Sequence, residues 1–341
     1  MVTSSSAFFL SMARLSFSTC APRPPAERQR GLAIVTALLV VAIVATSTAF
    51  LSLGQQVWLR QAQNLSDRAQ AETVRSGALE WAAIILTEDA KDNTIDDLTE
   101  AWAEDIPPLP AEGGLVTGHI VDAQGQFNLN NLVRGGQISN EDVAVFRRLL
   151  VSQELPAELA DSVVDWLDTD TNTQPNGAED IDYLNMEPPY RAANQFLQSV
   201  GELRLVKGFD RDAVEKLRPL ISALPEATSI NINTAPLAVL SALFPDLSLS
   251  EAENLLSKRK DNPFSDVGQL KNHLPSDAAL PKVPYDIKSS YFEVVIDTSF
   301  GRLQRHTVAL LHRPSGAPVK ILWQQRQLLV TKESKVGDGA E

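Results

Sequence analysis

Cysteine is almost absent from this sequence, with one residue in 341, Cys20. A chain with a single thiol forms no internal disulfide and offers no set of thiolates for a zinc site. Histidine is also scarce, and its four residues lie scattered without the spacing of metal ligands. These absences exclude a disulfide-stapled fold and a Cys/His metal centre.

Motifs of the common catalytic classes are missing as well. The sequence has no Gly-x-Ser-x-Gly, no Walker loop and no dinucleotide fingerprint. His119 and His306 fall on predicted strands, where we expect structural histidines. We therefore name no catalytic residue and expect no enzymatic activity.

Charge is absent from residues 32–53, which contain no Asp, Glu, Lys, Arg, His or Pro. A helix of about 22 residues is roughly 33 Å long, which matches the bilayer hydrocarbon. A secretory signal peptide begins in the same way, but its apolar core is typically only ~7–15 residues long. Residues 1–31 carry four arginines and one glutamate. Because positive flanks stay in the cytoplasm, we predict a single-pass helix with a cytoplasmic N-terminus and a periplasmic body.

The junction between Gly31 and Leu32 separates the basic residues from the apolar run. It resembles the processing site of type IV prepilin-like proteins, in which a membrane peptidase cuts after glycine and the new N-terminus is methylated. The resemblance implies cleavage between these two residues and N-methylation of Leu32. Most pilins and pseudopilins have Glu at the fifth position after the cut, where this chain has Thr36. The minor pseudopilin K of type II secretion is the member that lacks this Glu.

The net charge of the chain is −13, and residues 1–31 contribute +3, so the remainder carries −16. Such a surface repels nucleic acid and anionic lipid head groups. It suits a soluble periplasmic body or one that collects cations.

Beyond residue 53 the helical pattern continues, with apolar residues at broadly helical spacing among polar ones. A stem of this kind needs a globular partner to cover its apolar stripe. The stripe consists of Val57, Leu65, Val74, Ala78, Trp81 and Ile85.

Strand signals follow the stem. Residues 115–121 and 126–129 read as strands around a turn at 122–125, and Gly125 can supply the positive φ of that turn, so we predict a hairpin. The proline-rich segment 106–110 cannot be the interior of a helix and is predicted to link the stem to the sheet.

The rest of the chain predicts a helical block and then more strands, which together indicate an α+β module with a helical insertion. The predicted helices are 141–151, 156–167, 210–221, 236–244 and 250–260, and the predicted strands are 291–297, 303–311 and 319–323.

An acidic loop lies between two of these helices, at residues 168–182. With Asp168 as the first loop position, oxygen-bearing side chains fall at the first, third and fifth places and Glu179 at the twelfth, as in an EF-hand. The sixth position is Thr173 instead of the glycine that an EF-hand requires, so we do not expect a true EF-hand.

Brought together without a cation, the acids of this loop would repel one another, and Ca²⁺ accepts roughly six to eight such oxygens in flexible geometry. We predict a structural calcium site, and the alternative is a solvated acidic loop with a helix C-cap at Asn176-Gly177. The candidate ligands are Asp168, Asp170, Glu179, Asp180 and Asp182, with Asn172, Gln174 and Asn176 as weaker candidates.

Residues 230–240, 252–259 and 262–270 resemble the helix-hairpin-helix repeats of DNA-uptake and repair proteins. Those repeats contact phosphate through a glycine-rich hairpin, whereas residues 244–250 of this chain contain no glycine. The resemblance gives the alternative function, that of a membrane-anchored helix-hairpin-helix protein for DNA binding or uptake, although the missing glycine counts against it. We expect the motif to serve packing, with no nucleic acid partner.

Several stretches jointly resemble the type II secretion minor pseudopilin K family. They are 28–53, 125–132, 165–170 with 177–180, 189–194, 202–206 and 231–236. The resemblance implies a pseudopilin fold, in which a long N-terminal transmembrane helix packs on a small antiparallel sheet, with a large all-α insertion domain and calcium in the acidic loop.

The same resemblance implies a function and partners. The protein would cap the tip of the periplasmic pseudopilus and help to initiate its assembly for export of folded proteins across the outer membrane. Its partners would be minor pseudopilins I and J, through them H and the major pseudopilin G, prepilin peptidase, inner-membrane lipid and secreted substrate proteins.

The expected domain boundaries follow from these patterns. They are 1–31 for a cleaved leader, 32–53 for the transmembrane helix, 54–136 for the stem and first strands, 137–286 for the helical insertion, 287–330 for the last strands and 331–341 for a disordered tail.

Overall fold

A computed structural model describes residues 30–276 and 278–327 of the protein. The leader up to residue 29 and the tail predicted for 331–341 lie outside these residues. The chain divides into two compact units, Met1–Ala62 and Gln63–Glu341. Helix and sheet occur together, so the predicted α+β class is confirmed.

The long helix α1 spans Arg30–Asp92 and contains the predicted membrane segment. Its apolar side chains from Leu32 to Leu53 are exposed, and none of its most apolar stretch is buried within the protein. An apolar helix without protein around it is stable in lipid and not in water. By length and composition, α1 can therefore cross a membrane.

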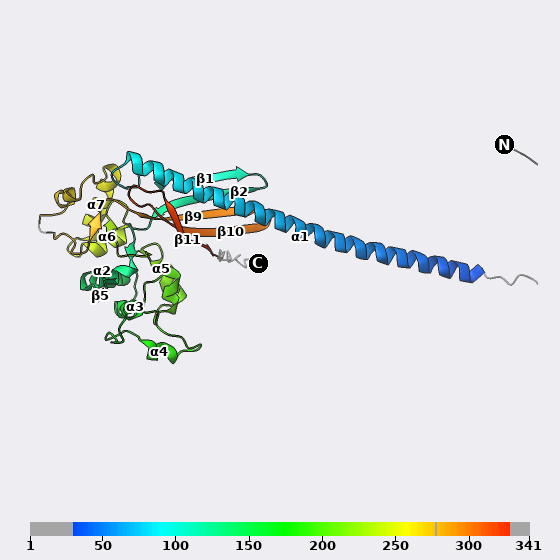
Figure 1. Ribbon diagram of the computed structural model, residues 1–341, viewed down its shortest axis with the longest axis horizontal. Helices are drawn as coiled ribbons and strands as arrows, with labels where there is room; N and C mark the ends of the chain where they lie inside the picture. Colours follow the sequence, from blue (N-terminus) through cyan, green and yellow to red (C-terminus); the bar gives the residue numbers. More distant parts are fainter. Residues whose placement is uncertain (1–29, 277, 328–341) are drawn as a thin grey trace, which may run out of the picture. The chain divides into compact units, whose positions relative to one another are not determined.

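Five strands of the second unit form an antiparallel sheet in the order β1-β2-β9-β10-β11 (Figure 1). In β9 the residues Phe292, Val294 and Ile296 are buried, in the alternation that the sequence predicts. The strands are β1 (Ile106–Ala111), β2 (Gly114–Asp122), β9 (Tyr291–Phe300), β10 (Leu303–His312) and β11 (Lys320–Gln327).

The final turns of α1 pack on one face of this sheet and share a hydrophobic core with it (Figure 1). The predicted stripe is displaced by one residue, since Trp81 remains 44% exposed. The sheet covers a neighbouring face of the helix, on which Leu79, Ala82 and Leu86 join the shared core. The buried positions are Ala71, Arg75, Leu79, Ala82 and Leu86.

The predicted hairpin over residues 115–129 is wrong. β2 pairs with β1 and β9, and the second expected strand is the short β3 (Phe127–Asn128), which pairs in parallel with β6 (Ile221–Ser222). The partner of β3 comes from a distant part of the chain, which local turn signals cannot indicate.

The role predicted for Gly125 is also wrong, because its φ is not positive. A Cβ at this position would lie 2.5 Å from the Thr234 hydroxyl oxygen, so glycine is needed for close packing and not for a turn. Positive φ occurs instead at Gly113 and Gly301, in the tight turns that join β1 to β2 and β9 to β10.

The proline-rich segment predicted as a linker is the edge strand β1. Proline cannot donate a ladder hydrogen bond, but an edge strand has a neighbour on one side only. The pairing of β1 with β2 shifts register between Ile106 and Leu109, and Thr117 Oγ1 donates to Ile106 O at 2.8 Å. The prolines thus lie where a sheet tolerates them.

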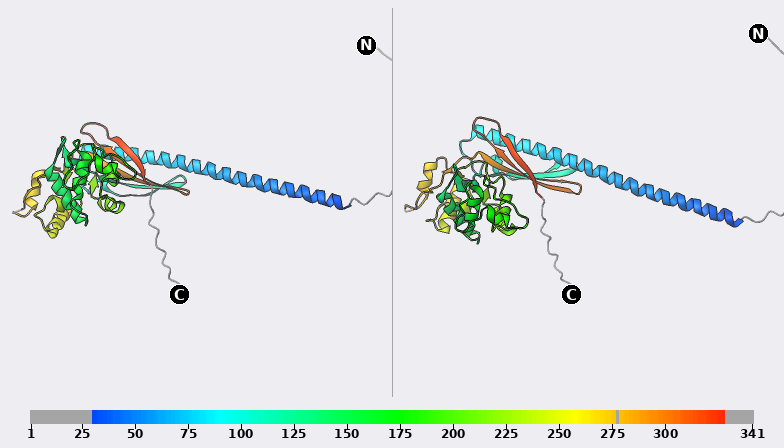
Figure 2. Two further views of the ribbon diagram at one scale, coloured as in Figure 1. Left: turned by 90° about the horizontal axis from the view of Figure 1, so that it is seen from below. Right: turned by 60° about the horizontal axis from the view of Figure 1, so that its bottom comes forward.

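Between β2 and β9 the chain forms a helical block with its own hydrophobic core, at one end of the sheet (Figures 1 and 2). The five predicted helices are confirmed with shifted ends, and the one expected over 210–221 stops before Pro219. The helices are α2 (Asn140–Ser152), α3 (Leu159–Leu167), α4 (Asp180–Leu184), α5 (Arg211–Leu217), α6 (Leu237–Leu243), α7 (Leu249–Asp261) and α8 (Leu270–His273).

Short strand pairs and single 3-10 turns connect these helices. The pairs are β4 (Val133–Arg134) with β5 (Gln137–Ile138) and β7 (Ile230–Asn231) with β8 (Tyr285–Asp286), and the turns are η2 (Leu129–Leu132), η3 (Val200–Leu205) and η4 (Val267–Gln269). A further turn, η1 (Ala101–Ala103), lies outside the block, between α1 and β1.

A buried carboxylate joins the block to the sheet. Asp122, at the end of β2, accepts hydrogen bonds from Asn231 Nδ2 at 2.9 Å, Thr234 Oγ1 at 2.5 Å and Ser289 Oγ at 2.7 Å. Its other oxygen accepts from the Gln124 amide at 2.8 Å. The donors come from three separate segments, so this one side chain positions the block on the sheet.

The core between α1 and the sheet generates a stability prediction. Leu86 is fully buried there, whereas Ile84 on the same helix is 58% exposed. We expect Leu86→Ala to lower the free energy of unfolding by about 2–5 kcal/mol, because it leaves a cavity. Urea unfolding of the full chain in detergent micelles measures the change.

The matched control is Ile84→Ala, which should change the free energy of unfolding by no more than about 0.5 kcal/mol. Equal effects of the two substitutions would show that the stem does not pack on the sheet through this face.

Candidate functional site

Helix α3 presents carboxylates on one face. Asp161, Asp165 and Asp168 follow one another at intervals of four and three residues, which places them on the same side of the helix and its C-cap. Asp161 pairs with Arg147 at 2.5 Å, while Asp165 is fully buried beneath the loop that follows.

Three carboxylates of the acidic loop converge beside this face. Asp168, Asp170 and Glu179 each offer an oxygen within 4.8 Å of the others. Asp168 and Glu179 are only 5% and 4% exposed, and among the described residues their four carboxylate oxygens have no hydrogen-bond partner. Buried polar groups are normally paired, so this cluster could hold a metal ion.

The electrostatics of the loop agree with this geometry. Burial, together with the negative charges of Asp165 and Asp168, raises the pKa of Glu179 to about 7. Burial likewise raises the pKa of Asp168 and brings that of Asp165 to about 6. A bound cation would offset the repulsion between these carboxylates, which contributes to their raised pKa values.

Asp165 is a residue that the sequence interpretation did not select. Its two oxygens accept the Gln174 amide at 3.1 Å, which folds the loop back over α3. A Cβ at Gly177 would lie 1.8 Å from Asp165 Oδ2, so only glycine fits there. The spacing of Asp161, Asp165 and Asp168 along one helix face was the signal that could have indicated it.

The remaining predicted ligands lie elsewhere. Asp180 pairs with Arg191 at 3.2 Å and accepts the Ala192 amide at 3.1 Å. Asp182 pairs with Lys207 at 3.0 Å. These two acids are therefore already neutralised at the start of α4.

The weaker candidates bond within the loop. The backbone amide of Asn172 donates to Asp170 Oδ1 at 2.7 Å, and the side-chain Nδ2 of Asn176 donates to Asp161 Oδ2 at 3.2 Å. Gln174 also donates through its backbone amide, to the carboxylate of Asp165. Asn172, Gln174 and Asn176 thus shape the loop around the cluster.

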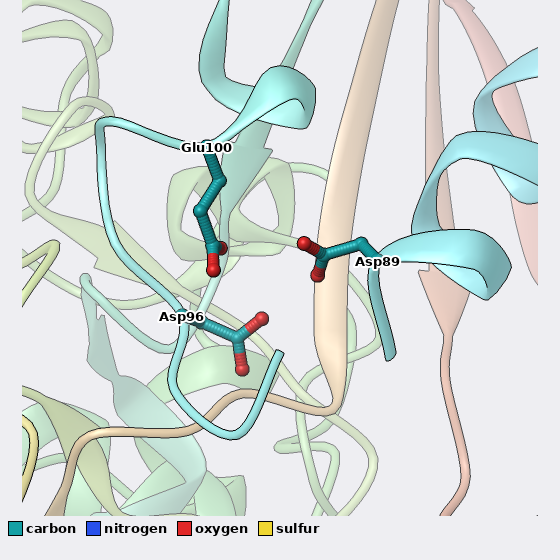
Figure 3. Close-up of side chains that lie close together, drawn as sticks. All are labelled: Asp89, Asp96 and Glu100. Carbon is teal, nitrogen blue, oxygen red and sulfur yellow. The ribbon is translucent and has the colours of Figure 1, made fainter. Parts of the chain in front are cut away.

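A second group of carboxylates, Asp89, Asp96 and Glu100, lies where α1 ends (Figure 3). It differs from the loop cluster because it contains a cation of the protein itself. Arg313 Nη1 donates to Asp89 Oδ2 at 2.7 Å, and Arg313 Nη2 donates to Asp96 Oδ1. The sequence interpretation did not anticipate this group, since its cation, Arg313, comes from a distant segment of the chain.

The segment that resembles helix-hairpin-helix repeats is part of the packed interior. Arg259 is 5% exposed, and its Nη1 donates to Ile232 O and Ala235 O, each at 2.7 Å. Asn233 exchanges two hydrogen bonds with the backbone of Phe264. Arg259 therefore holds a loop and is not available to contact a phosphate.

The expected processing site lies in the first turn of α1. Gly31 and Leu32 are helical, and Thr36 Oγ1 donates to Leu32 O at 3.1 Å or Ala33 O at 3.0 Å. The hydroxyl of Thr36 is thus satisfied within its own helix.

These observations define a class of protein. A long apolar helix whose end packs on an antiparallel sheet, with a helical insertion between two strands, is the architecture of a pseudopilin. Within residues 30–276 and 278–327, one helix is long and apolar enough to cross a membrane, which indicates a single-pass anchor. More particularly, the chain belongs to the family of type II secretion system protein K.

The family is established by two kinds of similarity in sequence. Models described as type II secretion system (T2SS), protein K, match residues 125–226 and 230–288. Type II secretion system protein K of Pseudomonas aeruginosa is 36% identical, over 86% of this chain and 92% of the relative. The protein of the same name from Pectobacterium carotovorum subsp. carotovorum is 33% identical, over 88% and 97%.

The fold agrees with this family. A solved structure, the GspK-GspI-GspJ complex of the type 2 secretion system from enterotoxigenic Escherichia coli, matches with a TM-score of 0.70 and 26% identity. The match covers 79% of this chain and 99% of the solved chain. The chain is thus a minor pseudopilin, a structural component of a secretion system.

Proposed function

We propose that this minor pseudopilin caps the tip of the periplasmic pseudopilus and helps to initiate its assembly, for export of folded proteins across the outer membrane. The observation that carries the proposal is the helical block at one end of the sheet (Figure 2). In a filament whose stems pack side by side, so bulky a block leaves no room for a subunit above it.

Thr36 supports the same position. In related subunits, Glu at this place is thought to meet the N-terminal amine of the preceding subunit in the filament. Here the side chain is a neutral hydroxyl that donates within its own helix. A subunit with nothing ahead of it needs no carboxylate there, and an unpaired charge in lipid would be costly.

The partners follow from the proposed position. A relative with this fold assembles with GspI and GspJ, so we propose minor pseudopilins I and J as direct neighbours. Through them the chain would contact H and the major pseudopilin G, and secreted proteins would meet the exposed tip. Prepilin peptidase would process the chain at the inner membrane, between Gly31 and Leu32.

We further propose that the role is structural and involves neither catalysis nor DNA. The net charge of −13 opposes phosphate binding, and Arg259 is committed to backbone carbonyls. At the motif that suggested a DNA-uptake protein, the exposed basic residues on α7 are only Lys258 and Lys260, among the described residues, which are few against the acidic total.

The acidic loop is proposed to bind one structural Ca²⁺ through Asp168, Asp170 and Glu179. The support is the pair of buried carboxylates without hydrogen-bond donors, together with the hard oxygen ligands that Ca²⁺ prefers. Asp180 and Asp182 would hold the start of α4 through Arg191 and Lys207 and not bind the ion directly. The bound ion would order the helical block.

Calcium binding is tested by Asp168→Ala in the full chain in detergent micelles. In the unsubstituted chain, a calcium concentration about 100 times Kd should add about 2.7 kcal/mol to the free energy of unfolding. Asp168→Ala should abolish this gain, because it removes a ligand, and equilibrium dialysis should show no calcium uptake.

The matched control is Asp180→Ala, which removes a carboxylate of the same loop that already has an arginine partner. It should retain calcium uptake. If the unsubstituted chain takes up no calcium, or if Asp168→Ala melts identically to it with and without calcium, the proposed site is wrong.

Processing is tested by Gly31→Ala, which adds a methyl group at the residue that the peptidase must accommodate. The precursor should stay uncut and secretion should stop, as read from the mass of the chain and the exoproteins in the medium. Gly54→Ala, in the same helix with open space around its Cβ, is the control and should be processed normally. A mature-sized product of Gly31→Ala would refute the assignment.

The position in the filament is tested in two steps. Tagged full chain solubilised in detergent should co-purify with pseudopilins I and J, and should bind no DNA at low salt. Immunogold labelling of assembled pseudopili should then mark one end of each filament. Labels spread along the length, or no recovery of I and J, would contradict the tip position.

A further inference from the structure

The end of the stem helix lies in a cluster of charges (Figure 3). Asp89 belongs to the last turn of α1, and Asp96 and Glu100 follow on the segment that leads to the sheet. One oxygen of each carboxylate lies within 4.8 Å of the others. Three like charges are thus gathered around a single point.

One cation faces them. The guanidinium of Arg313, which follows β10, bonds Asp89 and Asp96 as described above and donates to Ser289 O at 2.8 Å. Its Cζ lies 4.6 Å from the centre of the Phe292 ring. With all three carboxylates ionised, this group of four carries a net charge of two negatives.

Among the residues that the structure describes, no cation pairs with Glu100. Its Oε2 accepts from Trp102 Nε1 at 2.6 Å and from the Asp97 amide at 3.2 Å. Trp102 is 1% exposed and packs edge-on against Phe292, with ring centres 5.3 Å apart. Glu100 and Arg313 therefore hold the two sides of the same aromatic pair.

The segment also connects to the helical block. The Asp96 amide donates to Ile287 O at 2.8 Å, and Asn231 Nδ2 donates to Asp96 O at 3.0 Å. The Ser289 amide donates to Asp96 Oδ2 at 2.7 Å. Residues 93–103 thus join the stem, the sheet and the block.

Other charged groups near the cluster do not compensate Glu100. The carboxylate of Asp97 accepts hydrogen bonds from Thr99, and Asp122 adds negative charge near Asp96. Lys91 pairs with Glu88 at 2.7 Å, and Lys288 lines the adjoining cavity on the side of Asp96.

We propose that Asp89, Asp96, Glu100 and Arg313 form a proton-operated latch, here called the stem latch. With Glu100 protonated, residues 93–103 are held on the stem and the block. With Glu100 ionised, the second uncompensated charge loosens this segment. The stem latch depends on neither the calcium loop nor the partner proteins.

The direction of the effect follows from proton linkage. Burial, together with the negative charges of Asp89 and Asp96, raises the pKa of Glu100 from 4.5 to about 7. A group whose pKa is higher in the closed state stabilises that state fully below about 4.5, and the contribution is lost as the pH rises through about 7. The stem latch is therefore closed in mild acid and looser above neutrality.

Hydrogen exchange of the full chain in detergent micelles, at constant calcium, tests the proposal. After correction for intrinsic exchange, protection of residues 93–105 should fall about tenfold between about pH 6 and pH 8, as one proton with these pKa values requires. Glu100→Gln keeps an acceptor for Trp102 without the charge, so its protection should not change with pH.

The control is Glu104→Gln, an exposed acid of the same segment, which should keep the response of the unsubstituted chain. Equal protection of the unsubstituted chain at both pH values overturns the stem latch, and so does a Glu100→Gln chain that retains the pH response. If the Glu100→Gln chain does not fold, the pH dependence of hydrogen-exchange protection in the unsubstituted chain is sufficient to test the stem latch.

Discussion

The arrangement of this protein depends on how it compensates carboxylates that are removed from water. An uncompensated buried charge is so unfavourable that each such group must find donors, a cation or a proton. Asp122 accepts hydrogen bonds from Asn231 and Thr234 in one segment and from Ser289 in another, both far from Asp122 in the chain. Because these donors meet at one carboxylate, Asp122 helps to fix the helical block on the sheet.

Other buried carboxylates are compensated in different ways. Asp96 has the guanidinium of Arg313, which ties the end of the stem to the sheet. Asp168 and Glu179 have neither donor nor cation among the described residues, and this is the reason to place calcium between them. Near the stem Arg313 thus supplies part of the compensation, whereas in the acidic loop we propose that a bound ion supplies it.

Much of the local structure was predictable. The helices of the block and the strands after residue 290 were expected because apolar periodicity is local, and caps such as Ser139 and Ser248 lie where the helices begin. The hairpin was not correctly predicted, since β3 pairs with β6, almost a hundred residues away. The proline strand β1 was missed because its tolerance depends on being at an edge, which no local pattern reveals.

By itself the sequence determined the anchor, the helical content, the acidic loop and the family resemblance, because each of these is carried by contiguous residues. Only the tertiary structure decided which acids meet. It separated Asp168, Asp170 and Glu179 from Asp180 and Asp182, added Asp165, and brought Arg313 to Asp89 and Asp96. Electrostatic partners are chosen by distance in space, and spacing along a chain determines that distance only within one helix or one turn.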